Sequence, residues 1–452
     1  MPDTEKNLWI LSEERPKVEA IEQILKLVVG EEQKIDNIRP LFQNKKFQFK
    51  YEIQSTGKHF SQIMLELVSG TSSFADFLIF QQKESPEPEK EEQPTHIIEE
   101  TKTTSKESRN TSVGQRLSKF VFTEFFPKLF KNSEKVMLWN TRTGTQKNPP
   151  DTFVDGIKRL RTLDVKILGL EKTGIDLNEK KYQKYESIED LIKELDNKRL
   201  PPKGNTPVKI TKKENKIEIS GKLKNGNNWH DPNMGNLSSL VLILRKFGWK
   251  HDIIITKHEI TQEKLNRARG NKFVKIANRF NVKLDGRKLP KPDIDEYYWK
   301  KGGSKEKIGS IFLHMLIDYY KKQKIIYENH GSSEQGYFIT KIGEYLQIGK
   351  QEAKPDLIIL DEKNKEIFIL EAEFSKNILN GIKQLDGFST IEKKYCKEYY
   401  PGYKYKRFVI LYGDESSNAK EVIFTLKTDG TIICSKNCPQ IIKDAVEKIQ
   451  NS

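Results

Sequence analysis

Cysteine is scarce in this chain, and its scarcity limits how the fold can be stabilised. Only Cys396, Cys434 and Cys438 occur among 452 residues. Three thiols cannot form a disulfide framework, so we expect an apolar core to hold the fold, in a reducing compartment. Cys434 and Cys438 have a spacing that zinc ligands can have. No second Cys or His pair lies in register with them, which argues against a zinc site.

Long apolar runs are also missing. No stretch approaches the roughly 20 apolar residues that a membrane-spanning helix needs. The first residues, Met1 to Lys6, mix both charge signs and lack the apolar segment of an export signal. We therefore expect a cytoplasmic protein with no membrane partner.

Acidic residues are outnumbered by basic ones. The chain has 79 Lys and Arg against 64 Asp and Glu, a formal net charge of +15. Such an excess attracts polyanions at long range, which favours nucleic acid as the partner. The alternative is a lysine-rich surface that serves solubility alone.

The length exceeds that of one ordinary hydrophobic core, so we predict several domains. Apolar spacing and turn residues predict an α/β protein with mixed sheets flanked by helices, divided into residues 1–140, 141–300 and 301–452. The first and last domains share an order of helix, strands, helix and strand, with a more polar middle module between them. Helices are predicted from near Pro16 to Gly30 and at 112–130, 308–320 and 378–399, and the main strands at 47–53, 63–68, 75–81, 95–103, 135–140, 208–210, 216–220, 252–256, 356–360, 366–374 and 407–412.

Three carboxylates fall within strongly apolar strands of the last domain. Asp356 precedes Leu-Ile-Ile-Leu, and Glu371 and Glu373 follow Ile-Phe-Ile-Leu. An ionised carboxylate among such neighbours loses hydration unless positive charge compensates it, and a metal ion compensates several acids at once. Residues two apart in a strand share a face, so Glu371 and Glu373 should point together, with Asp356 alongside if its strand pairs with theirs. Carboxylates with room for water suit Mg²⁺.

A second version of this pattern lies upstream. Asp76 lies in the apolar run Phe-Ala-Asp-Phe-Leu-Ile-Phe, and Glu100 and Lys102 share one face of the next predicted strand. We expect Asp76 to approach Glu100 and Lys102 to hold the attacking water. For both clusters, the alternative is a set of surface acids on a solvated strand.

These acid patterns resemble the PD-(D/E)XK nuclease superfamily, and type II restriction endonucleases in particular. The resemblance covers both end domains and implies two restriction-endonuclease-like cores around the middle module. It departs from the pattern at Ala75, where proline is usual, and at Glu373, where lysine is usual. It implies two catalytic sets, Asp76 with Glu100 and Lys102, and Asp356 with Glu371 and Glu373; Mg²⁺ would be held by Asp76, Glu100, Asp356 and Glu371.

Several residues are candidates for DNA contacts. Gln115 and Gln384 each lie in the helix after an acid set, as in many nucleases of the superfamily. Arg109 follows the first set, and Arg267 and Arg269 form a basic stretch in the middle module. Each basic residue could equally be plain surface.

The sequence thus predicts a Mg²⁺-dependent type II restriction endonuclease that cleaves double-stranded DNA at a specific sequence, alongside a cognate DNA methyltransferase. Two competent sites would let a monomer cut both strands, whereas one live site would require a homodimer. Two alternatives remain: a non-catalytic nucleic-acid-binding protein with inactive nuclease folds, and a structure-selective repair nuclease.

Overall fold

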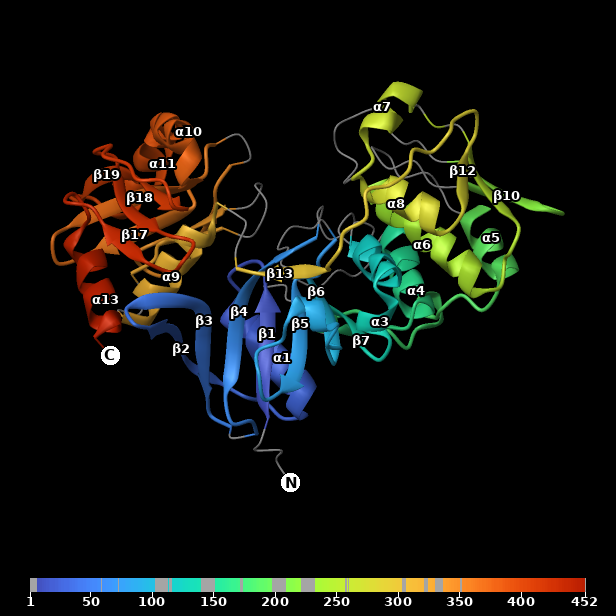
Figure 1. Ribbon diagram of the computed structural model, residues 1–452, viewed down its shortest axis with the longest axis horizontal. Coiled ribbons are helices and arrows are strands. Elements are labelled where there is room, and N and C mark those ends of the chain that lie inside the picture. The colour runs from blue at the N-terminus through green and yellow to red at the C-terminus, as the bar shows by residue number, and fades with distance from the viewer. Residues whose placement is uncertain are drawn as a thin grey trace. The chain divides into compact units, whose positions relative to one another are not determined.

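The structure is a computed structural model that describes residues 6–57, 59–71, 73–101, 113, 116–139, 151–170, 174–196, 209–220, 232–256, 258, 260–302, 306–320, 324–329, 336–349 and 352–451. It divides into two compact units (Figure 1). Unit 1 combines residues 1–69, 82–85 and 301–452, and unit 2 combines 70–81 and 86–300. Unit 1 therefore draws on both ends of the chain, and its second part begins at the predicted boundary after Lys300.

The N-terminal part of unit 1 is a small sheet with one helix. β1 pairs in parallel with β4, and β3 runs antiparallel to β2 and β4. The predicted first helix is confirmed: its apolar positions recur every three or four residues and are buried, and it ends at Gly30, whose φ of 86° favours glycine. The elements are β1 (Asn7–Ser12), α1 (Val18–Val29), β2 (Ile35–Gln43), β3 (Lys46–Ser55) and β4 (Ile63–Gly70).

The C-terminal part of unit 1 is a five-stranded mixed sheet between helices. β17 and β18 form an antiparallel pair, and β18, β19 and β20 are parallel. The elements are α9 (Ile308–Tyr320), β14 (Tyr327–Asn329), β15 (Gly336–Ile339), β16 (Tyr345–Gln347), β17 (Leu357–Asp361), β18 (Glu366–Phe374), α10 (Ile378–Gln384), α11 (Ser389–Ile391), α12 (Lys397–Tyr399), β19 (Lys404–Tyr412), β20 (Val422–Leu426), β21 (Ile432–Cys434) and α13 (Gln440–Gln450), and β13 (Trp299–Lys301) precedes them.

Helices α9 and α10 cover opposite faces of this sheet (Figure 1). Gly309 of α9 lies against Ile410, and Gly381 of α10 lies against Val409, the preceding residue of β19. Adjacent strand residues point to opposite faces, so the two helices must lie on opposite sides. Burial on both faces explains why β17 and β18 read as continuous apolar runs.

The two ends of the chain share one core in unit 1. The ring of Phe47 in β3 lies 4.5 Å from that of Phe312 in α9, and Phe312 stacks on Phe424 of β20. The Phe47 amide also donates a hydrogen bond of 2.9 Å to the carbonyl of Gly430. The β2–β3 hairpin is thus completed by residues almost 400 positions later.

Unit 2 contains two four-stranded arrangements with the same connectivity. In each, an antiparallel pair is followed by two parallel strands, as in β17 to β20. The elements are β5 (Phe77–Gln82), β6 (His96–Thr101), α3 (Pro127–Phe130), β7 (Glu134–Trp139), α4 (Asp151–Thr162), β8 (Val165–Leu168), α5 (Ile188–Asp196), β9 (Lys209–Lys213), β10 (Lys216–Ser220), α6 (Pro232–Lys246), β11 (Asp252–Thr256), α7 (Gln262–Arg267), α8 (Lys272–Arg279) and β12 (Val282–Leu284), and residues 116–122 are also helical.

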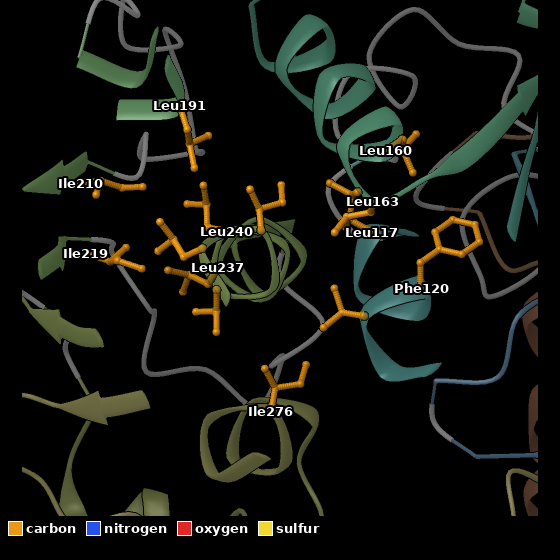
Figure 2. Close-up of a cluster of buried hydrophobic side chains, with 14 of the residues drawn as sticks. Leu117, Phe120, Leu160, Leu163, Leu191, Ile210, Ile219, Leu237, Leu240 and Ile276 are labelled. Atoms are coloured by element: carbon orange, nitrogen blue, oxygen red, sulfur yellow. The ribbon is translucent and has the colours of Figure 1, made fainter. Parts of the chain in front are cut away.

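One hydrophobic core runs through unit 2. Figure 2 shows Leu237 and Leu240 of α6 between the side chains of β9 and β10 and those of the helices around them. The cluster extends from Val113 to Leu284 and so crosses residue 140, where the sequence suggested a domain boundary. The protein is of the expected mixed α/β class. In the described part of the chain, no helix has the length and apolarity to cross a membrane.

Candidate active site

Asp356 lies opposite Glu371 at one end of the β17–β18 pair. Leu357 is paired with Leu370, and continuing this register by one residue brings Asp356 opposite Glu371. The Asp356 amide donates to the Leu370 carbonyl at 3.0 Å. Asp356 Oδ2 in turn accepts a hydrogen bond of 3.0 Å from the Ala372 amide. Backbone pairing therefore fixes one carboxylate beside the other, as the sequence suggested.

Glu371 and Glu373 point to the sheet face that α10 covers. Glu371 is paired with Val409, and a Cβ at Gly381 of α10 would lie 3.2 Å from both Val409 and the Glu373 Cβ. A side chain at Gly381 would crowd this close contact between the helix and the sheet. The exposed fractions of Glu371 and Glu373 are only 8% and 5%, so both carboxylates are largely shielded from bulk water.

Glu306 and Lys307, directly before α9, extend this group, and we call these five residues the Asp356 cluster. Lys307 Nζ lies 3.4 Å from Asp356 Oδ1. Burial, Asp356, Glu373 and Glu306 together raise the pKa of Glu371 to about 9, although Lys307 opposes the shift. Burial also raises the pKa of Asp356 and, with Glu373 and Asp356, that of Glu306. One lysine does not balance four carboxyl groups.

Two buried oxygen atoms at the Asp356 cluster have no hydrogen-bond partner in the described part of the chain. They are Glu371 Oε2 and the hydroxyl of Tyr327 in β14. Burial, together with the charges of Asp356 and Glu371, raises the pKa of Tyr327. A Cβ at Gly336 would overlap this hydroxyl, so glycine makes room for it. Buried polar atoms without partners are rare and mark positions where a ligand or water belongs.

The donor set of the Asp356 cluster fits a hard divalent cation. Within the residues that the structure describes, no three His, Cys, Asp or Glu side chains converge as a ready-made metal cage. Mg²⁺ does not need such a cage, since it keeps several waters and takes one or two carboxylates with substrate phosphate oxygens. Asp356 and Glu371 could supply those two carboxylates.

Asp76 is paired across its strands in the same way as Asp356. Its partner, however, is one residue earlier than the predicted Glu100. Phe77 is paired with Ile98, which brings Asp76 opposite Glu99. The Glu100 amide donates to Asp76 Oδ2 at 2.6 Å, just as the Ala372 amide donates to Asp356. Glu99 is thus the counterpart of Glu371, and the side chain of Glu100 belongs to the opposite face of β6.

Two basic side chains already neutralise these acids. Arg116 Nη1 donates to Glu99 Oε1 and lies 3.4 Å from Asp76 Oδ2, and Lys119 Nζ lies 3.5 Å from Glu99 Oε2. We call these four residues the Asp76 cluster. Burial and Asp76 raise the pKa of Glu99, whereas Lys119 and Arg116 lower it. Although burial opposes the change, Glu99 and Asp76 raise the pKa of Arg116.

Of the remaining predicted residues, those that the structure describes, Gln384, Arg267 and Arg269, join neither cluster. Lys102, Arg109 and Gln115 lie outside the described residues. Gln384 is exposed at the last position of α10. In unit 2, Arg267 at the end of α7 is paired with Glu263, and Arg269 is exposed and donates to the Lys291 carbonyl.

Sequence reasoning missed Glu99 as the partner of Asp76, and missed Arg116, Lys307 and Tyr327. Because Glu99 and Glu100 are adjacent, the strand register was ambiguous. Their separations from Asp76 along the sequence do not show which of the two lies opposite it. The other three come from separate elements that only the fold brings near the acids.

No protein-family model, curated protein or solved structure matches this chain. Its function must therefore be inferred from the two clusters themselves.

Proposed function

We propose that this protein is a Mg²⁺-dependent endonuclease that hydrolyses phosphodiester bonds of double-stranded DNA, with restriction-endonuclease-like cores. The supporting observation is the largely shielded Asp356–Glu371 pair, with Glu373 and Glu306 near and, among the described residues, Lys307 as the one basic side chain paired with them. A fold keeps such an arrangement at a cost in stability, which cation binding can offset. The net charge of +15 suits a polyanionic substrate.

Asp356 and Glu371 would hold the cation, and Glu371 Oε2 offers it an oxygen with no other described partner. Bound there, Mg²⁺ would polarise the scissile phosphodiester and lower the pKa of the attacking water. The hydrogen bond from the Ala372 amide keeps Asp356 Oδ2 oriented. Helix α10 covers this face and keeps bulk water away from Glu371 and Glu373.

Glu373 would orient the attacking water. It follows Glu371 by two residues and shares its face, and its Oε1 accepts a hydrogen bond of 3.1 Å from the Phe374 amide. Water oxygen attacks phosphorus and gives up a proton to solvent, one ester P–O bond breaks, and the departing alkoxide takes a proton from solvent. The products are a phosphate monoester and a free hydroxyl group.

Cleavage is assigned to the Asp356 cluster and not to the Asp76 cluster. Arg116 and Lys119 supply the Asp76 cluster with two positive charges for Asp76 and Glu99, so it has little need of a cation. One active cluster in each chain breaks one strand. A double-strand break by a type II restriction enzyme would then require two chains, with a cognate methyltransferase protecting the host DNA.

Incubation of purified protein with unmodified plasmid and phage DNA in Mg²⁺ tests this function. We expect discrete fragments that EDTA abolishes, and loss of cleavage in Asp356→Asn. The matched control is Asp386→Asn, which changes an exposed carboxylate of the same unit. Binding without cleavage would instead support a non-catalytic DNA-binding protein, and cleavage confined to junctions or damaged sites would support a repair nuclease.

A further inference from the structure

Lys307 has a fixed backbone at the start of α9 and a side chain that reaches the Asp356 cluster. Its carbonyl accepts hydrogen bonds of 2.9 Å from the Ile311 amide and the Ser310 hydroxyl, which fix its backbone at the start of α9. Its side chain is 36% exposed and reaches Asp356 Oδ1 at 3.4 Å. The backbone of Lys307 is therefore fixed, while the four flexible methylene groups of its side chain let the ammonium move.

Within the described residues, Lys307 is the one basic side chain that an ion pair joins to this cluster. Its contact is with Asp356 Oδ1, because Oδ2 accepts the hydrogen bond from the Ala372 amide. Oδ1 is thus the Asp356 oxygen that remains for a cation. An ammonium group and a divalent ion cannot both lie close to this oxygen without strong repulsion.

A displaced Lys307 ammonium has a clear alternative partner. A phosphodiester brought to the cluster carries negative charge beside the cation, and this charge grows as water attacks. The exposed part of the Lys307 side chain gives the ammonium a path toward solvent, from which DNA arrives.

We propose that Lys307 is a displaceable counter-ion. In the cation-free protein it pairs with Asp356; a divalent ion then takes Asp356 Oδ1, and the released ammonium binds the DNA phosphate at the cleavage position. The second half of this proposal rests on the proposed function, whereas the first half concerns cation binding alone.

Calorimetric titration of the DNA-free protein with Mg²⁺ tests the exchange. Removal of the competing ammonium in Lys307→Met should tighten Mg²⁺ binding about tenfold. Lys307→Arg should bind Mg²⁺ as the wild type does, and so should the control Lys363→Met, which changes an exposed lysine in the β17–β18 turn. Asp356→Asn should remove binding in any background. Loss of a lysine that only supports the fold could not tighten Mg²⁺ binding, so tighter binding is specific to the exchange. Weaker or unchanged Mg²⁺ binding by Lys307→Met would overturn it.

DNA binding at several salt concentrations tests the released ammonium. One extra phosphate contact steepens the dependence of log K on log salt by about 0.9. Addition of Ca²⁺ should produce that increase in the wild type and not in Lys307→Met, which should also cleave at least tenfold more slowly in Mg²⁺. Equal slopes for the two proteins would refute the phosphate contact. If Mg²⁺ displaces Lys307 from Asp356 in the wild type but the protein neither binds nor cuts DNA, the proposed function fails while the exchange stands.

Discussion

Asp356 faces Glu371 across the β17–β18 pair, and the amide of the next residue, Ala372, donates to Asp356 Oδ2 at 3.0 Å. This pairing forces two carboxyl groups together in a place largely closed to water. The ladder hydrogen bonds of both strands stabilise the arrangement, so the acids cannot separate without loss of sheet structure. The burial of these groups and their mutual repulsion should therefore be visible in the stability of the protein.

The unfolding free energy should fall as pH rises from about 4.5 to about 9 in the absence of divalent ions. The pKa of Glu371 is 4.5 in its ordinary state and about 9 in the fold, so folding takes up a proton throughout this range. The slope for one such group is at most about 1.4 kcal/mol per pH unit. Denaturant titrations at several pH values should show a reduced slope in Glu371→Gln and an unchanged slope in Glu366→Gln, which alters a half-buried residue at the other end of the same strand. Equal slopes in Glu371→Gln and wild type would contradict the prediction.

Divalent cations should stabilise the wild-type protein. Mg²⁺ at one hundred times its dissociation constant adds about 2.7 kcal/mol, provided that it binds only the folded state. Thermal unfolding should shift upward by several degrees in the wild type and in Glu99→Gln, but not in Asp356→Asn. A shift lost in Glu99→Gln and kept in Asp356→Asn would place the cation site in the Asp76 cluster.

Arg116→Met should destabilise the protein by about 3 kcal/mol, because it leaves the buried Glu99 and the half-buried Asp76 with less compensation. Glu99→Gln in the same chain should restore part of this loss, since the neutral amide no longer needs the guanidinium. A double-mutant cycle in denaturant measures the coupling. Additive effects would show that Arg116 and Glu99 act independently.

Tyr327→Phe should raise stability by about 1 kcal/mol or more, because the buried hydroxyl has no described hydrogen-bond partner. If that hydroxyl holds water at the cleavage site, the same variant should cut DNA more slowly. Tyr345→Phe, at an exposed position of β16, is the control. A less stable Tyr327→Phe would mean that the hydroxyl is bonded in solution.

The sequence predicted the elements whose apolar pattern is strong. Residues 308–320 and 366–374 match α9 and β18 as predicted, because α9 is apolar on nearly all sides and β18 contains the apolar run Ile-Phe-Ile-Leu. The predicted helix at 378–399 is confirmed as an unbroken run of helical residues, but it varies along its length between α10, α11, α12, a 3-10 turn at Leu385–Phe388 and a π-helical turn at Glu392–Cys396. Helical periodicity alone cannot reveal such irregular turns, since their apolar residues recur at similar spacing.

The candidate site was predictable in part for the same reason. Asp356, Glu371 and Glu373 stand out because acids interrupt apolar strands, and strand alternation places the two glutamates on one face. The register of Asp76 could not be read from a sequence with two adjacent glutamates. Arg116 and Lys307 were hidden because lysine and arginine are common along this chain, and only tertiary packing selects these two.

The joining of Phe47 to Gly430 has a consequence for how the chain is made. The ribosome synthesises the β2–β3 hairpin long before its partners in α9 and β20 exist, so unit 1 cannot close until synthesis is nearly complete. Unit 2, whose core extends from Val113 to Leu284, can mature earlier. Chaperones that shield exposed apolar surface during translation should therefore engage the N-terminal hairpin for most of the synthesis time.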